Sequence, residues 1–154
     1  MEFPRPDPIQ LALLHRFAGD WSGPELASPS PWGPGGPATG HGSYRVGLDG
    51  TALLQDYRQE KDGQVVFRGH GVFLIEPDSG DVLWWWFDSM GFPPQPARGH
   101  WQGDTLHFEK VTPRGEARYR YDFAGDRYRF TIENRFPGQS DFAEFIRGDY
   151  ARQS

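Results

Sequence analysis

Apolar and polar residues alternate along most of the chain, from about residue 39 to residue 150, with the period of two typical of strands that have one dry and one wet face. The segment "EARYRYDF" (116–123) is an example, because its tyrosines alternate with charged residues. Turn signals such as Asp62-Gly63 and Gly125-Asp126 interrupt the alternation at intervals of roughly 8–15 residues, as hairpin turns do. The pattern therefore predicts an all-β domain built from an antiparallel sheet.

Nine or ten strands are expected from this pattern. A single open sheet of that size would leave unprotected edges, and closure into an up-and-down barrel removes them. A two-sheet sandwich is the competing architecture, but its Greek-key topology needs long crossovers, whereas the turns here are short. We therefore predict a β-barrel. Its strands are expected at about 19–24, 40–48, 51–60, 64–76, 81–89, 97–102, 104–112, 116–123, 127–136 and 142–150.

The first residues show a different period. Ile9, Leu13 and Phe17 recur every four positions, which predicts a short helix over about residues 8–18, and Pro8 suits the first helical position. We expect this helix to cap one end of the barrel. The Pro/Gly-rich residues 24–40 that follow are expected to form a loop.

Composition narrows the possible partners. The 154 residues suit one domain, and the net charge of −5 comes without a basic stripe, so a nucleic-acid partner is not expected. The chain has no cysteine, its first residues lack the pattern of a signal peptide, and no apolar run approaches the roughly 20 residues of a membrane span. We therefore expect a single cytoplasmic domain, residues 1–154, with no membrane partner.

Several segments resemble known sequences. A Gly-x-Trp at the start of the first strand, in "LHRFAGDWSG" (14–23), resembles the opening of calycins, which include lipocalins, fatty-acid-binding proteins and nitrobindins. With "LDGTALLQDY", "GHGVFLIEPDSGDVLWWWFDSM" and "GDTLHFE" it is similar to the bacterial family known as domain of unknown function 1579. The most specific part is "WFDSM" (86–90) after a Pro-Asp-x-Gly turn. The resemblance implies a calycin-like barrel, and that family has no settled activity to transfer.

Nitrobindin-like proteins bind haem through a histidine late in the chain, so the positions of the histidines test whether this chain could do the same. None of the five histidines here lies in the last 47 residues. By strand parity His41, His100 and His107 face solvent, while His70 stays ambiguous because glycines flank it. No His/Asp/Glu cluster has the spacing of metal ligands either. Haem binding is therefore a minor alternative, and we expect neither cofactor nor metal.

A catalytic triad has the right residue types in Asp88, Ser89 and His100 but not the right arrangement. On a regular strand Asp88 and Ser89 point to opposite faces, and the chain lacks a Gly-x-Ser-x-Gly elbow. We expect both residues to end their strand and to bond the loop "MGFPPQP" that follows. No catalytic residue is predicted, and an enzyme at the barrel mouth stays a minor alternative.

The predicted inward face is rich in tyrosine and tryptophan. Such an interior suits a ligand with an apolar body and one or two polar atoms, although small barrels can also be filled by their own side chains. Asp88 follows Trp84 and Trp86 on their face and could anchor a ligand at the mouth. We predict non-catalytic binding of a small, largely apolar ligand. The candidate pocket residues are Trp21, Tyr44, Trp84, Trp86, Asp88, Tyr119, Tyr121, Phe130 and Asn134.

The triple tryptophan in "DVLWWWFDSM" (81–90) places rings on both faces of one strand. The family resemblance implies that Trp84 and Trp86 point inward, so Trp85 and Phe87 lie outside and need a cover. A second subunit is the favoured cover, and the loop around Trp32, which we expect to fold back onto the barrel as a plug, is the alternative. The sequence thus also predicts a homodimer, whose function would then be structural or a matter of protein interaction.

Overall fold

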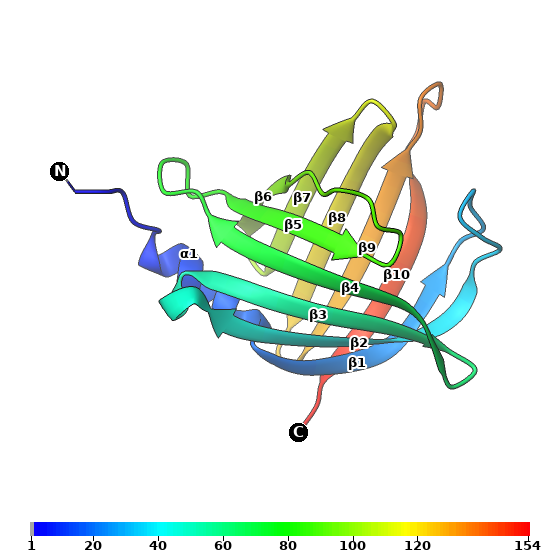
Figure 1. The fold of residues 1–154 in the computed structure, drawn as a ribbon, viewed down its shortest axis with the longest axis horizontal. Coiled ribbons are helices and arrows are strands. Elements are labelled where there is room, and N and C mark those ends of the chain that lie inside the picture. Colours follow the sequence, from blue (N-terminus) through cyan, green and yellow to red (C-terminus); the bar gives the residue numbers. More distant parts are fainter. Residues whose placement is uncertain (1) are drawn as a thin grey trace.

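The ten strands close into one antiparallel barrel in which every strand pairs with its sequence neighbours and β1 pairs with β10 (Figure 1). The computed structural model describes residues 2–154. Its order confirms the predicted up-and-down barrel and excludes the sandwich. The strands are β1 (Gly19–Ala27), β2 (Gly36–Gly47), β3 (Ala52–Lys61), β4 (Gln64–Ile75), β5 (Val82–Asp88), β6 (Ala97–Gln102), β7 (Thr105–Thr112), β8 (Gly115–Ala124), β9 (Arg127–Arg135) and β10 (Ala143–Arg152).

The N-terminal helix is shorter than predicted. The helix α1 (Pro8–Leu14) starts with a hydrogen bond from the Ile9 amide to the Asp7 side chain, and a 3₁₀ turn, η1 (His15–Phe17), replaces its last turn. This tighter turn delivers Phe17 into the barrel with no exposed surface. The helix therefore caps one end of the barrel, as expected, and we call this the closed end.

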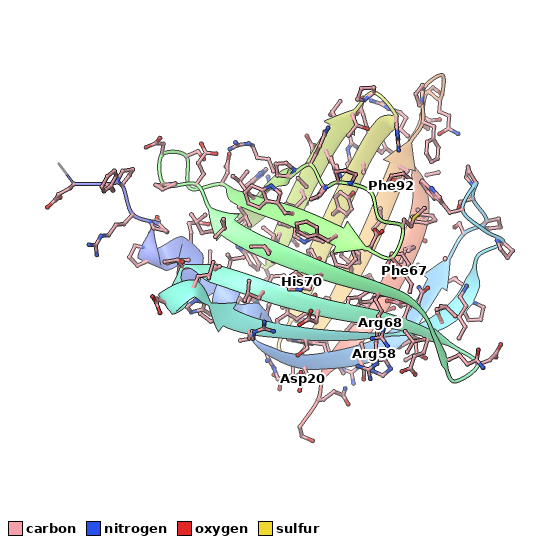
Figure 2. The ribbon with its side chains drawn as sticks, viewed as in Figure 1. Asp20, Arg58, Phe67, Arg68, His70 and Phe92 are labelled. Carbon is pink, nitrogen blue, oxygen red and sulfur yellow. The ribbon has the colours of Figure 1, made fainter. Side chains whose placement is uncertain are left out.

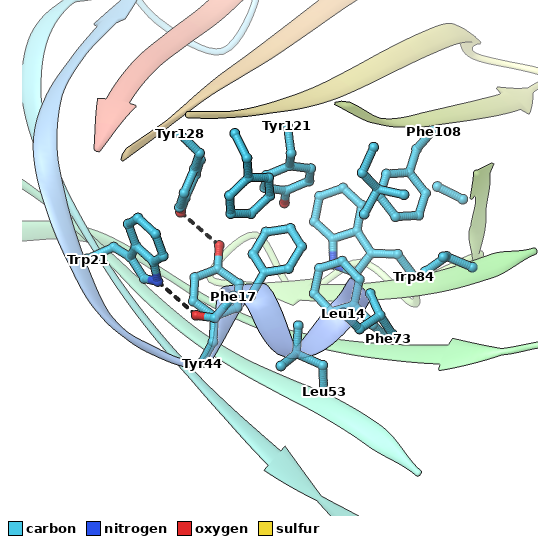
Figure 3. Close-up of a cluster of buried hydrophobic side chains, with 14 of the residues drawn as sticks. Leu14, Phe17, Trp21, Tyr44, Leu53, Phe73, Trp84, Phe108, Tyr121 and Tyr128 are labelled. Carbon is cyan, nitrogen blue, oxygen red and sulfur yellow. Dashed lines mark hydrogen bonds between the residues drawn. The ribbon is translucent and has the colours of Figure 1, made fainter. Parts of the chain in front are cut away.

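The closed half of the barrel holds a continuous aromatic core (Figure 3). Phe17 lies at its centre, with ring centroids of Phe123, Tyr44 and Tyr121 at 4.7–5.0 Å. The Trp21 indole donates a 2.7 Å hydrogen bond to the Phe17 carbonyl, which ties the first strand to the capping turn. Each buried ring removes roughly 150–250 Å² from water, so this cluster is a main source of stability.

The loop predicted over residues 24–40 is shorter in the structure, so both of its predicted bounds are wrong. β1 continues to Ala27 and β2 begins at Gly36, so the connection spans only residues 28–35. Pro24 misled the prediction because proline cannot donate to a ladder. The structure accommodates it where the pairing of β1 with β10 is interrupted, while the pairing with β2 runs through it without a break.

The other end of the barrel, which we call the mouth, is formed by five connections. One of them, residues 89–96, joins β5 to β6, and Phe92 lies on it (Figure 2). β5 pairs with β6 at only three positions, Val82 to Trp84. The rest of β5 pairs with β4 alone, so the segment 89–96 borders the mouth where the sheet is least continuous.

Candidate functional site

A cavity of about 1010 Å³ opens at the mouth and extends into the barrel. It exists because several inward positions of β2 and β4 hold glycine, in contrast to the rings that fill the closed half. Aromatic side chains and a few polar groups line its inner part. These inner residues are Glu25, Tyr44, Gln55, Tyr57, Gln59, Phe67, Trp84, Trp86, Tyr119, Tyr121, Tyr128, Phe130 and Tyr150.

Eight of the nine candidate pocket residues line this one cavity: Tyr44, Trp84, Trp86, Asp88, Tyr119, Tyr121, Phe130 and Asn134. Trp21 is the exception, because it is buried in the core of the closed half. Asn134 lies half-buried near the mouth, and no side chain within residues 2–154 hydrogen-bonds its amide. That the eight bind a ligand stays a prediction.

A charged side chain lines the inner part of the cavity: the carboxylate of Glu25, a residue that is 4% exposed. The Tyr57 hydroxyl lies 2.7 Å from each carboxylate oxygen, and the Gln59 amide donates to Oε1 at 2.9 Å. The Tyr150 hydroxyl donates to Oε2. An ionised carboxylate accepts hydrogen bonds and donates none, so three donors are the partners it requires. We call Glu25 with these three residues the carboxylate floor.

A second set of hydrogen bonds joins the floor of the cavity to the closed core. The hydroxyls of Tyr44 and Tyr128 lie 3.0 Å apart, and the Gln55 amide donates to the Tyr44 hydroxyl at 3.0 Å. The Trp84 indole in turn donates to the Gln55 carbonyl oxygen at 3.2 Å. Buried polar groups are costly when unpaired, and here each one has a partner. The chain of bonds therefore fixes the orientation of Trp84 in the cavity wall.

Burial keeps the tyrosines of the cavity neutral. It raises the pKa of Tyr44 to about 12 and that of Tyr119 to about 12. For Tyr57 and Tyr150 burial is again the largest cause of a raised pKa, and the charge of Glu25 adds to it. These hydroxyls are therefore hydrogen-bond donors throughout the neutral range.

Trp86 and Asp88 stand at the mouth. The Trp86 indole donates to Asp88 Oδ2 at 2.9 Å, and the Met90 amide donates to Oδ1 at the same distance. Burial lowers the pKa of the nearby Lys110, and the charge of Asp88 partly opposes this. Asp88 thus orients a cavity-lining indole and holds the start of the segment 89–96, as predicted. The Ser89 side chain instead bonds the backbone of Arg68 in β4, so the predicted bond from Ser89 to the loop that follows is wrong.

Two glycines are required by the close approach of these groups. A Cβ on Gly40 would lie 2.1 Å from Glu25 Oε2, so only glycine leaves room for the carboxylate. A Cβ on Gly69 would lie 2.1 Å from the Trp86 ring, which rests against the β4 backbone there. The glycines of the cavity wall therefore determine its shape together with the large side chains that line it.

The histidines lie away from the cavity. None of them lines it within residues 2–154. His70, whose direction the sequence left open, points outward and contacts Asp56 at 2.8 Å. His100 and His107 stack on the outer face with ring centroids 6.1 Å apart. The part of the chain that is described also has no group of three His, Cys, Asp or Glu side chains placed to hold a metal.

Trp85 and Phe87 lie on the outer face of β5. Phe87 is 45% exposed, and Trp85 is half-buried opposite Val72 of β4. Trp32 does not cover them. Its ring packs instead on Phe145 and Phe136 at the mouth, with centroids at 5.1 and 5.7 Å, where it is 52% exposed and lines the outer part of the cavity. The homodimer inferred from Trp85 and Phe87 stays a prediction.

None of the four residues of the carboxylate floor was predicted as a site residue. Glu25 fell in the predicted loop, and Tyr57 and Gln59 were not singled out. A signal for the last two exists, because Leu53, Gln55, Tyr57 and Gln59 are four successive uncharged positions on one face of β3, while the opposite face carries Asp56 and Arg58. An uncharged polar face opposite a charged one indicates a polar interior.

Comparison with known proteins supports the fold and little beyond it. No family model matches the chain, and no curated protein matches it in sequence. Its structure is similar to that of Rv2717c from M. tuberculosis, with a TM-score of 0.75 at 17% identity over 97% of this chain and 99% of that one. It is also similar to the S-type phycobiliprotein lyase CpeS from Guillardia theta, with a TM-score of 0.66 at 12% identity over 98% and 99%. Both comparisons show a calycin-like barrel, and the family suggested by the sequence stays a prediction.

No helix in residues 2–154 combines the length and the apolar character that a membrane span requires.

Proposed function

We propose that the barrel binds a small, largely apolar ligand in its cavity without converting it chemically. The observation that carries this proposal is the cavity itself: about 1010 Å³, open at the mouth, walled by aromatic rings and with few polar groups. Ligand sites of soluble proteins typically measure roughly 300–1,000 Å³ and have such linings. The fold likeness to a phycobiliprotein lyase, at 12% identity, carries no ligand over to this chain.

The rings of the wall are held in place before any ligand arrives. Trp84 is fixed by its bond to Gln55, and Trp86 by its bond to Asp88. Tyr119 meets the Trp84 ring edge-on at 5.1 Å and stacks with Phe130 at 6.4 Å. A preformed wall costs little ordering entropy on binding, which favours affinity.

The proposal is tested with 1-pyrenemethanol, a neutral, flat, fluorescent probe. Ala117→Phe adds a ring inside the cavity near the mouth, whereas Val111→Phe adds the same ring at an outer position of β7 that is 72% exposed. We expect saturable binding to the wild type, a loss of at least about tenfold in affinity for Ala117→Phe, and no change for Val111→Phe.

Native mass spectra of the freshly purified protein supply an independent measurement. A native mass above the denatured mass shows a retained ligand and supports the proposal. The proposal fails if the native mass equals the denatured mass and the probe binds neither to the wild type nor to the control variant.

A further inference from the structure

Within the carboxylate floor, Glu25 is, among residues 2–154, the one charged side chain in the inner, aromatic part of the cavity. The other charged side chains that line the cavity belong to its outer part: Lys61, Asp88, Lys110, Arg114 and Glu116. Glu116 is already paired with Arg135 at 2.9 Å, and Arg114 stacks on Phe92. No basic side chain within residues 2–154 forms a salt bridge with Glu25. The floor therefore lacks the cation that a buried carboxylate normally has.

The hydrogen bonds to Glu25 leave it able to accept one more. A carboxylate offers about four lone-pair positions, and its three partners supply one proton each, because the Tyr57 hydroxyl shares a single proton between both oxygens. The residue also lines the cavity. A donor that enters from the mouth can therefore reach a free acceptor position on a charged group.

Aromatic rings surround this acceptor. Tyr57 and Tyr150 donate to Glu25, so their rings lie next to it, and the Trp86 ring centroid lies 5.9 Å from that of Tyr57. Phe67 adds a further ring, 6.3 Å from Tyr57. Ring faces attract cations, and a carboxylate ringed by aromatic side chains is a recurrent arrangement for recognising ammonium groups. The same arrangement repels a carboxylate ligand.

We infer that the ligand of this cavity carries a protonated amine, or an equivalent N–H donor of positive charge, that bonds Glu25, with its apolar body between the rings of the wall. This inference rests on the proposed function. It assigns the class of ligand: aromatic or apolar amines, in preference to fatty acids and other anions.

The test compares three probes with the same ring system: 1-pyrenemethylamine, 1-pyrenemethanol and 1-pyrenecarboxylic acid. A hydrogen bond to a charged partner predicts that the wild type binds the amine about 10- to 100-fold more tightly than the acid, with the alcohol between them. Glu25→Gln keeps the size of the side chain and removes its charge, so the ratio of amine to acid should fall to near one. Glu144→Gln makes the same change at an exposed position of β10 that does not line the cavity; it is the matched control and should leave the ratio unchanged.

The outcomes separate the inference from the function on which it rests. If the alcohol binds while amine and acid bind equally to the wild type, the inference is wrong and the proposed function stands. If none of the three binds, both fall together. Should Glu25→Gln not fold, Tyr57→Phe replaces it: this variant keeps the charge and frees a second acceptor position, so the preference for the amine must persist or increase. A preference lost in Tyr57→Phe overturns the inference.

Discussion

The two halves of the barrel share one sheet and one alternation of inward and outward residues, yet one half is solid and the other is hollow. In the closed half, the inward positions hold rings that pack on Phe17. In the mouth half, several inward positions hold glycine, such as Gly40 and Gly69, and polar side chains such as Glu25 share the space that they leave. The comparison teaches that the size of the inward residues, and not the strand count, decides whether a small barrel contains a cavity.

The largest expected effect comes from the same deletion made in each half. Phe17→Ala should lower the free energy of unfolding by about 3–5 kcal/mol, because the ring is fully buried and its loss leaves a void. Phe67→Ala, in the half-buried wall of the mouth, should cost about 1 kcal/mol, since water already reaches that side chain. Urea unfolding of the two variants measures both values. Equal losses would show that the two halves are packed alike.

Alkaline pH probes the buried hydroxyls that join the halves. Tyr44 is neutral in both states below pH 10, so its contribution is fully present there. Above pH 10 the unfolded chain loses the proton while the folded chain keeps it up to about pH 12. The free energy of unfolding should therefore fall by about 1.4 kcal/mol per pH unit from this residue alone. Tyr44→Phe should make the pH dependence between 10 and 12 shallower by that amount, as measured by urea unfolding at each pH, and an unchanged slope would refute the assignment.

A methyl group added to the floor of the hollow half should have a smaller effect. Gly40→Ala places a Cβ against the Glu25 carboxylate and should destabilise the protein by about 1–3 kcal/mol, with weaker binding of 1-pyrenemethanol. Gly33→Ala is the matched control, because nothing lies within 4 Å of its Cβ position. We expect that variant to unfold within about 0.5 kcal/mol of the wild type. If Gly40→Ala also unfolds within about 0.5 kcal/mol of the wild type, the floor is less tightly packed than described.

The smallest effect on the fold is expected outside the barrel. Phe87→Asp changes an exposed side chain and should leave the thermal unfolding of a monomer within about 0.5 kcal/mol of the wild type. If the predicted homodimer exists, the wild type sediments as a dimer and Phe87→Asp sediments as a monomer. Sedimentation velocity of both proteins measures this, and a monomeric wild type contradicts the predicted homodimer.

The strands could be predicted from the sequence because alternation and turn residues report local structure. All ten predicted strands overlap the observed ones, and the outward direction of Trp85 and Phe87 follows from parity once the family resemblance places Trp84 and Trp86 inward. The end of β1 could not be predicted, since Pro24 is a turn residue by composition and becomes a strand residue only through the break in its pairing with β10.

The candidate site could be predicted in part. Tyr119 and Tyr121 were found because large rings stand out against a charged opposite face, and eight of the nine candidate residues line the cavity. The carboxylate floor was not found, because Glu25 and Tyr150 come from opposite ends of the chain and no local pattern links them. Trp21 was placed in the pocket because parity distinguishes inward from outward and gives no depth along the barrel.

The meeting of β1 with β10 also has a consequence for folding kinetics. Each of the other nine pairings joins consecutive strands, whereas this seam joins residues as far apart as Glu25 and Tyr150. Closing so long a loop carries the largest entropic cost, and such distant contacts slow folding. The carboxylate floor therefore exists only once the barrel has closed. A ligand that binds Glu25 and Tyr150 together would bridge β1 and β10, and it would slow unfolding more than it speeds folding.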